Sequence, residues 1–129
     1  MNSNQVHILV VDDAEDQREI FARYLSENGY RVSIAGDEKE GLEKTFRLMP
    51  DLVLLDLWPP KISGREVLHQ LKSDARTSHI PVVVLTGETQ VPPRECDGFL
   101  TEPFRLEEIG EEIIHRLNAP VRASLRRSV

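Results

Sequence analysis

The sequence has little of several things, and each shortage removes a class of protein. Cys96 is the single cysteine among 129 residues, which excludes an intrachain disulfide and a cysteine-based zinc site. No apolar stretch approaches the ~18 residues that a membrane span needs, and residues 1–7 lack the charged and apolar segments of a signal peptide. We therefore expect a cytoplasmic protein without a membrane span.

Basic residues are also scarce. The chain has 16 lysines and arginines against 22 aspartates and glutamates, for a net charge of −6. Binding to a phosphate backbone needs a basic face, so the composition argues against nucleic acid as the main partner. An apolar fraction of 40% and a charged fraction of 29% are typical of a globular protein, and the length suits one compact domain.

Short apolar runs that stop at oxygen-bearing side chains are the most informative feature present. They are HILVV (His7–Val11) before Asp12-Asp13, LVLL (Leu52–Leu55) before Asp56, and IPVVVL (Ile80–Leu85) before Thr86. Runs of this kind, without polar alternation, read as strands covered on both faces of a parallel sheet. Ligands bind beyond the carboxyl ends of such strands. We therefore expect the oxygens to converge on one acidic pocket.

Strand and helix patterns alternate along the chain, which predicts an α/β fold: a doubly wound parallel sheet with helices on both faces. Two further strands are predicted at Arg31–Ala35 and Gly98–Leu100. The predicted helices are Ala14–Asn28, a helix that begins at an Asp37–Glu40 capping box and ends before Pro50, about Gly64–Ser73, and Leu106–Leu117. Their predicted inward faces contain Ile20, Phe21, Tyr24 and Leu25; Leu42, Phe46 and Met49; Val67, Leu68 and Leu71; and Leu106, Ile109, Ile113 and Leu117.

The segment Gly87–Asp97 breaks this rhythm. A helix would belong there, but Pro92-Pro93 removes two backbone donors and biases Val91 away from helical angles. We expect a loop or at most one turn, so that the fourth helix of the fold is shortened or missing. Residues 1–118 are predicted to form the single domain, and residues 119–129 a flexible C-terminal tail.

The acidic pocket suits a hard cation. Mg²⁺ prefers oxygen ligands and binds through one or two carboxylates, often together with a phosphate, so Asp12, Asp13 and Asp56 are candidate ligands. Capping of the following helix is the alternative role for one member of the Asp12-Asp13 pair. A carboxylate can also form an aspartyl phosphate, for which Asp56 is the candidate acceptor. The Thr86 hydroxyl and the Gly87 N–H are candidate donors to the phosphoryl oxygens.

At this point the chain resembles the receiver domains of two-component response regulators, in particular the single-domain members. The resemblance extends from about Val6 to Leu117. Its motifs are ILVVDD (Ile8–Asp13), DLVLLDLWPP (Asp51–Pro60), Ser63-Gly64, IPVVVLTG (Ile80–Gly87) and DGFLTEPF (Asp97–Phe104). It implies a five-stranded sheet of order 2-1-3-4-5, and transfer of a phosphoryl group to Asp56 from a histidine kinase or a phosphotransfer protein. The phosphorylated domain would signal through protein contacts. Such a domain is not an enzyme beyond Mg²⁺-dependent self-phosphorylation and slow self-dephosphorylation.

The resemblance also implies individual roles. Asp12 and Asp13 would hold Mg²⁺ together with Asp56 and the backbone carbonyl of Trp58. Thr86 would be the switch hydroxyl. Phe99 would be the switch aromatic, and Glu102-Pro103 would form a cis peptide.

Two departures from the family pattern keep other readings open. Glu102 stands where the family has a lysine that contacts the phosphoryl group, and the Gly87–Asp97 segment is short. A degenerate receiver that binds partners without phosphorylation is the alternative. A phosphatase of the haloacid dehalogenase type is disfavoured because it needs an aspartate two positions after its nucleophile. Two positions after Asp12, at position 14, the chain has alanine. A nucleotide-binding enzyme is disfavoured because the sequence has no G-x-x-x-x-G-K-[ST] motif and no G-x-G-x-x-G motif after the first strand.

Overall fold

The computed structural model describes residues 5–58 and 62–117. The predicted tail at 119–129 and the two prolines at 59 and 60 lie outside the described residues. The strands are β1 (His7–Val11), β2 (Arg31–Ala35), β3 (Leu52–Asp56), β4 (Val82–Thr86) and β5 (Gly98–Thr101). The helices are α1 (Glu15–Glu27), α2 (Glu38–Leu48), α3 (Ile62–Ser73) and α4 (Leu106–Leu117).

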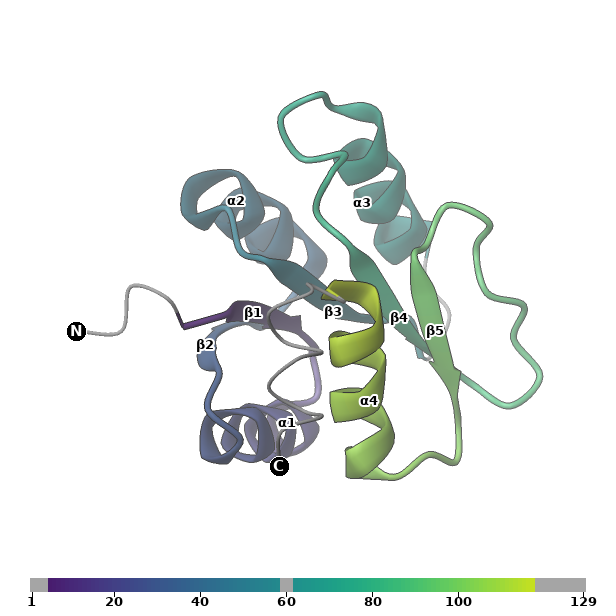
Figure 1. Ribbon diagram of the computed structural model, residues 1–129. Helices are drawn as coiled ribbons and strands as arrows, with labels where there is room; N and C mark the ends of the chain where they lie inside the picture. Colours follow the sequence, from purple (N-terminus) through teal and green to yellow (C-terminus); the bar gives the residue numbers. More distant parts are fainter. Residues whose placement is uncertain (1–4, 59–61, 118–129) are drawn as a thin grey trace.

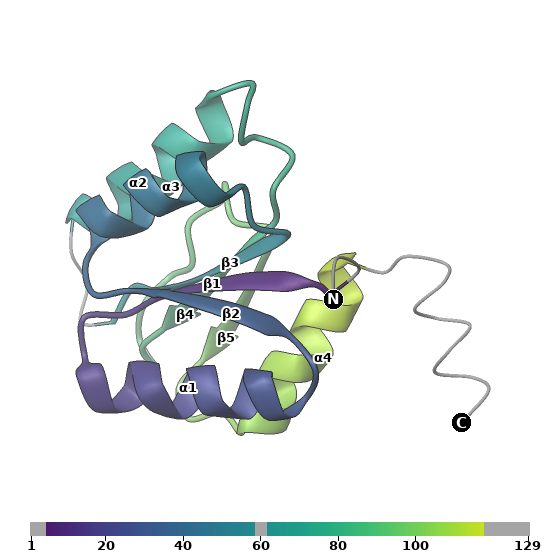
Figure 2. The same cartoon turned by 90° about the vertical axis from the view of Figure 1, so that its left-hand side faces the viewer.

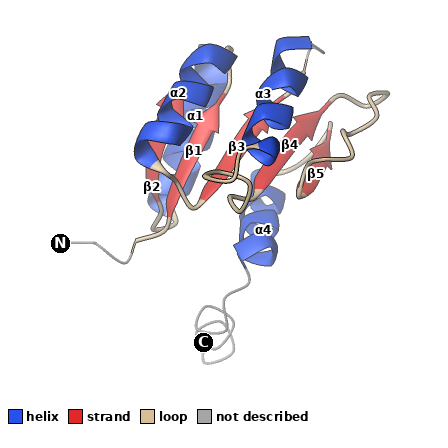
Figure 3. Cartoon of the chain, turned by 90° about the horizontal axis from the view of Figure 1, so that it is seen from above, coloured by secondary structure: helices blue, strands red, loops and turns tan. Residues whose placement is uncertain are grey.

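The strands form one parallel sheet of order β2-β1-β3-β4-β5 (Figures 1 and 3). Figure 2 shows α2 and α3 on one face of the sheet and α1 and α4 on the other. The predicted doubly wound α/β fold, its strand order and its two helical layers are therefore confirmed. Because all strands run the same way, the residues that follow β1, β3 and β4 gather at one end of the sheet, the edge formed by the carboxyl ends of the strands.

The unbroken apolar runs become buried strands because successive side chains enter opposite cores. In β1, Leu9 and Val11 belong to the core under α2 and α3, whereas Ile8 and Val10 belong to the core under α1 and α4. Every residue of β1 and of β4 is buried. At about 1.5–3 kcal/mol for each fully buried aliphatic side chain, this burial is the main stabilisation of the sheet.

Helix α1 packs through a narrower face than predicted. Phe21 and Leu25 are buried, as expected, and Tyr24 is partly buried. Ile20 is 54% exposed, so its prediction as an inward residue is wrong. Residues four apart lie on one face of a helix, and the stripe that reaches the sheet continues from Leu25 and Phe21 back to Gln17 rather than to Ile20.

The N-terminus of α2 is capped nearly as predicted. The Asp37 side chain accepts a hydrogen bond from the Glu40 N–H at 2.8 Å. The returning bond is shifted by one residue, since the Glu40 carboxylate accepts from the Gly36 N–H at 2.8 Å. The carboxylate therefore stabilises the turn that joins β2 to α2, one residue before the position that a capping box would use.

The inward face of α2 is rotated relative to the prediction. Gly41 and Thr45 are the buried residues of the helix, and the predicted Leu42 and Phe46 are only partly buried. Met49, also predicted to face inward, is 42% exposed and follows the helix in a left-handed conformation. Gly41 permits this close approach, because a Cβ atom there would lie 2.8 Å from a methyl group of Val11.

The remaining two helices pack as predicted. In α3, Val67, Leu68 and Leu71 are buried, although the helix begins at Ile62, two residues earlier than expected. In α4, Ile109 and Ile113 are completely buried. The predicted end residues Leu106 and Leu117 pack partly buried against the same core.

Residues 87–97 contain turns but no helix, which confirms the prediction for this segment. The loop is attached to α3 by polar contacts: Arg65 donates to the Val91 carbonyl at 2.8 Å, and His69 pairs with Glu95 at 2.6 Å. An open depression of about 580 Å³ adjoins the loop and is lined in part by Pro92, Phe99 and Arg116. In the described ranges, no helix has the length and apolar character that a membrane crossing requires.

Candidate functional site: an acidic pair at the end of the sheet

The ends of β1 and β3 bring two carboxylates together. Val11 is the register partner of Leu55, so Asp12 and Asp56 follow on neighbouring strands. Asp12 is only 2% exposed and Asp56 is partly buried, whereas Asp13 points to an exposed position. The predicted convergence of Asp12 and Asp56 at one edge is therefore confirmed.

Each carboxylate commits one oxygen to the main chain. Asp12 Oδ1 accepts from the Ala14 N–H at 2.9 Å, and Asp56 Oδ1 accepts from the Trp58 N–H at 2.8 Å. The helix-capping alternative is not realised by Asp12, because the N-cap residue of α1 is Ala14; the Asp12 carboxylate instead holds the turn before the helix through the Ala14 N–H. These bonds orient both carboxylates so that their Oδ2 atoms face a common donor.

That donor is Gln17, which the sequence analysis did not identify. Its Nε2 atom lies 2.9 Å from Asp12 Oδ2 and 2.9 Å from Asp56 Oδ2. A signal was available in the sequence, because Gln17 lies four residues before Phe21 and eight before Leu25 on the buried stripe of α1. A polar residue at a core-facing position is informative because it needs a buried partner.

Burial and neighbouring carboxylates together set the electrostatics of the site. Burial raises the pKa of Asp56 to about 8, and the charges of Asp12 and Asp13 and a hydrogen bond to Asp12 act in the same direction. The N–H of Trp58 opposes this shift by stabilising the carboxylate. The raised pKa means that Asp56 favours its protonated form when no cation is near, and that a nearby positive charge would favour the carboxylate.

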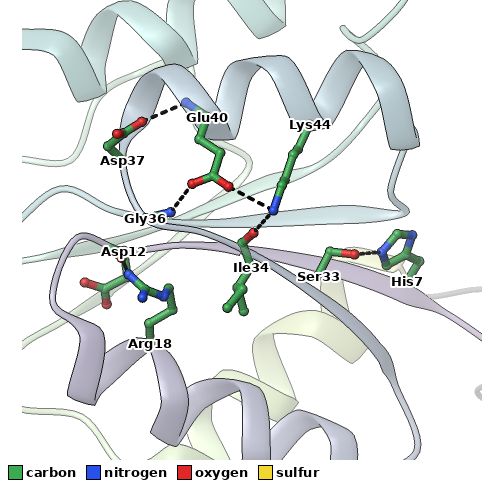
Figure 4. A network of polar contacts seen from close by, with 9 residues as sticks. All are labelled: His7, Asp12, Arg18, Ser33, Ile34, Gly36, Asp37, Glu40 and Lys44. Atoms are coloured by element: carbon green, nitrogen blue, oxygen red, sulfur yellow. Dashed lines mark hydrogen bonds and ion pairs between the residues drawn. The ribbon is translucent and has the colours of Figure 1, made fainter.

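Arg18 lies beside Asp12 (Figure 4). Its Nη1 atom donates to the main-chain carbonyl of Asp12 at 2.9 Å, and the N–H of Asp12 donates to the Ala35 carbonyl at 3.1 Å. These two contacts fix the main chain at the end of β1. The Asp12 carboxylate remains directed towards Gln17.

The two candidate phosphoryl donors are engaged with protein groups. Thr86 is completely buried, and its hydroxyl lies 3.4 Å from the Leu100 carbonyl and 3.3 Å from the Thr101 hydroxyl. The Gly87 N–H donates to the Gln90 side chain at 2.9 Å, and Gln90 in turn donates to the Leu57 carbonyl at 3.1 Å. Gln90 is a second residue that the sequence analysis missed. The donor roles of Thr86 and Gly87 stay predictions.

Beyond Thr86, β5 contributes the remaining predicted residues. Phe99 is 49% exposed, and its switch role stays a prediction. Glu102 is partly buried at the end of β5, its N–H donates to the Thr86 carbonyl at 2.9 Å, and its bond to Pro103 is cis, as expected. Thr86 pairs with Thr101 in register, so Glu102 stands at the same edge of the sheet as the acidic pair.

Two carboxylates at this end of the sheet are available to a metal ion. Across residues 5–58 and 62–117, no group of three or more His, Cys, Asp or Glu side chains is arranged to hold a metal. Mg²⁺ usually binds through only one or two carboxylates and keeps several waters, and Asp12 and Asp56 meet that requirement with Oδ2 atoms on a common donor. The oxygen chemistry and the raised pKa of Asp56 therefore fit a divalent cation.

The indole of Trp58 covers Gly87. A Cβ atom at position 87 would lie 2.3 Å from Cε3 and 2.5 Å from Cζ3 of the ring. Trp58 is the single tryptophan of the chain and is 45% exposed. Its fluorescence therefore reports on the surroundings of Asp56 and Gly87.

This contact gives a first prediction. Gly87→Ala is expected to push the indole into water, which shifts the Trp58 emission to longer wavelength, at a stability cost of about 1 kcal/mol. Gly110→Ala is the matched control, because a Cβ atom there meets the Tyr24 hydroxyl at 3.1 Å and no atom of Trp58. Emission spectra of both variants test the contact, and an unchanged spectrum for Gly87→Ala would contradict it.

Comparisons with known proteins agree with this geometry. The chain matches the family model of the response regulator receiver domain over residues 8–114, a range that contains Asp12, Asp56 and Thr86. It is 40% identical over 129 residues to proteins named "Response regulator MprA" from Mycobacterium leprae and Mycolicibacterium vanbaalenii. The match covers 95% of this chain and 52% of each relative, so the chain spans about half the length of these relatives.

Solved structures show the same fold. The chemotaxis protein CheY4 of Vibrio cholerae superposes with a TM-score of 0.75 at 25% identity, over 86% of this chain and 98% of that one. The receiver domain of NtrX from Brucella abortus gives a TM-score of 0.75 at 26% identity, over 87% of this chain and 98% of that one.

Proposed function

Because the chain belongs to the family of response regulator receiver domains, we propose that Asp56 accepts a phosphoryl group from a histidine kinase or a phosphotransfer protein. The phosphorylated domain then signals through contacts with a partner protein. The pairing of Asp56 with Asp12 at the end of the sheet carries this proposal, because it combines an acceptor oxygen with a place for a cation. Two-component signal transduction is the general role of the family.

Asp56 is the proposed nucleophile, and one oxygen of its carboxylate forms the new P–O bond. The bond to phosphorus in the donor, P–N in a phosphohistidine, breaks as this bond forms. No electrons are gained or lost. Positioning of the reacting groups and neutralisation of charge accelerate the transfer.

Mg²⁺ would be held by Asp12, Asp13, Asp56 and the Trp58 carbonyl, and when bound it neutralises the carboxylates and the phosphoryl oxygens. The protein groups supply the rest. For Gly87 to donate to a phosphoryl oxygen, its N–H must leave Gln90. For Thr86 to donate, its hydroxyl must leave the Leu100 carbonyl, to which it donates at 3.4 Å. We propose that release of Thr86 from β5 links the site to Phe99 and the depression beside it.

A degenerate receiver remains the second candidate. Glu102 adds a carboxylate at an edge that is already acidic, and the donors of Thr86 and Gly87 already have protein partners. Such a domain would keep the fold and bind partners without accepting a phosphoryl group. The segment 87–97 without a helix would then be part of a constitutive binding face.

Incubation with acetyl phosphate and Mg²⁺, followed by intact mass measurement, distinguishes the two candidates. The proposal predicts a gain of one phosphoryl group that is lost in Asp56→Asn and in EDTA. Asp51→Asn is the matched control, because it removes a carboxylate at the other end of β3, where Asp51 accepts from the His7 N–H at 2.8 Å. The absence of any mass gain in the wild-type chain would favour the degenerate receiver.

A further inference from the structure

The side-chain amide of Gln17 lies between the Oδ2 atoms of Asp12 and Asp56. One amide nitrogen lies 2.9 Å from Oδ2 of each carboxylate. A primary amide carries two N–H donors, so both bonds are made at once. Nitrogen rather than oxygen must face the pair, because the amide oxygen would be repelled by the two carboxyl groups.

A cation and this amide need the same atoms. The Oδ1 atoms of Asp12 and Asp56 are bonded to the N–H groups of Ala14 and Trp58, so the Oδ2 atoms, which face Gln17, are the oxygens without a main-chain bond that a shared metal would use. Mg²⁺ would approach these atoms to about 2.0–2.1 Å. The N–H groups of Gln17 carry partial positive charge and point at the same oxygens, so the amide must turn away before the ion can bind.

We propose that Gln17 is a positioning residue that holds Asp12 and Asp56 together while the cation is absent and competes with the cation for them. The inference rests on the proposed function only in using the same two carboxylates. It explains how two carboxyl groups stay side by side in the metal-free domain, since an internal donor from α1 bridges them. It also means that metal affinity is set in part by a residue outside the acidic motif.

The test is a Mg²⁺ titration of the full chain followed by Trp58 fluorescence and, in parallel, by isothermal titration calorimetry. Loss of two competing hydrogen bonds is expected to tighten Mg²⁺ binding about 3- to 10-fold in Gln17→Ala. The metal-free form of this variant is expected to melt at a lower temperature. Gln17→Met, which keeps the length of the side chain but lacks the donors, is expected to tighten binding in the same direction.

Gln70→Ala is the matched control, because Gln70 is an exposed glutamine on α3, and its Mg²⁺ affinity is expected to equal that of the wild-type chain. Unchanged affinity in both Gln17 variants would overturn the inference. Weaker affinity would also overturn it, because the amide oxygen would then be acting as a ligand.

The mass assay with acetyl phosphate separates this inference from the proposed function. Tighter Mg²⁺ binding in the Gln17 variants without phosphorylation of Asp56 would support the inference and refute the function. Phosphorylation of Asp56 with unaltered Mg²⁺ affinity in the variants would refute the inference alone.

Discussion

Asp56→Asn is expected to stabilise the metal-free protein, and the gain is expected to grow from pH 4 to pH 8. The folded chain holds the pKa of Asp56 at about 8 because the side chain is buried beside Asp12 and Asp13, whereas an unfolded chain ionises an aspartate near pH ~3.9. Between these values the folded state binds an extra proton, so the free energy of unfolding falls as pH rises. Asparagine is neutral at every pH and removes this loss.

The size of the effect follows from the same difference. The wild-type chain is expected to lose at most about 1.4 kcal/mol per pH unit across this range. Solvent screening of a partly buried group reduces the total to roughly 2–4 kcal/mol, which corresponds to a difference in melting temperature on the order of 10 °C at pH 8. The asparagine amide can also donate a hydrogen bond to Asp12, as the protonated carboxyl group of Asp56 does.

Thermal unfolding in EDTA at pH 5, 6, 7 and 8, followed by circular dichroism, measures the effect. Asp51→Asn, at the opposite end of β3, is the control and is expected to keep the wild-type slope with pH. Parallel pH profiles for Asp56→Asn and the wild-type chain would show that Asp56 does not hold its proton in the folded state. Mg²⁺ should stabilise the wild-type chain more than Asp56→Asn, because ligand binding to the folded state adds stability.

Glu102→Lys is expected to raise the fraction of Asp56 that acetyl phosphate phosphorylates about tenfold. Glu102 follows β5 at the end of the sheet that also holds Asp12 and Asp56, so the substitution removes one negative charge there and adds a positive one. A single pair of charges at ~4 Å contributes on the order of 4 kcal/mol at an effective dielectric constant of ~20. Glu102 is partly exposed, and water therefore reduces this figure to about 1–2 kcal/mol.

The extent of phosphorylation at limiting acetyl phosphate, read by intact mass, measures the effect. Glu43→Lys is the matched control, because it makes the same change of net charge at an exposed position of α2. Equal phosphorylation of the two lysine variants would mean that the charge at position 102 does not act on the site. A gain confined to Glu102→Lys would show that the negative charge of Glu102 lowers the phosphorylation of Asp56.

The parallel sheet and the acidic pair could be predicted from the chain because they depend on strong local patterns, whereas the strand order was implied by the resemblance to receiver domains. Apolar runs that stop at Asp12-Asp13, Asp56 and Thr86 indicate buried parallel strands, and parallel strands gather their carboxyl ends at one edge. The loop at 87–97 was equally readable, since Pro92-Pro93 is incompatible with a continuous helix. These features need no knowledge of which side chains touch.

The residues whose burial was predicted wrongly are those whose packing depends on neighbours far away in the sequence. Ile20 and Met49 are apolar and near the expected periodicity, yet they are exposed, because the rotation of a helix about its axis is decided by the surface on which it packs. Helix α2 packs on the sheet with Gly41 against Val11. Helix α1 packs with Gln17, and not Ile20, on its inward face.

By itself the sequence determined the elements, their order and the edge at which the carboxylates meet, because hydrophobic periodicity and proline act locally. Only the tertiary structure decided that Gln17 bridges Asp12 and Asp56 and that Thr86 and Gly87 are already bonded to Thr101 and Gln90. Hydrogen-bond partners are selected within a few tenths of an ångström by the packing of whole helices and strands. That selection is a property of the folded chain and not of any segment of it.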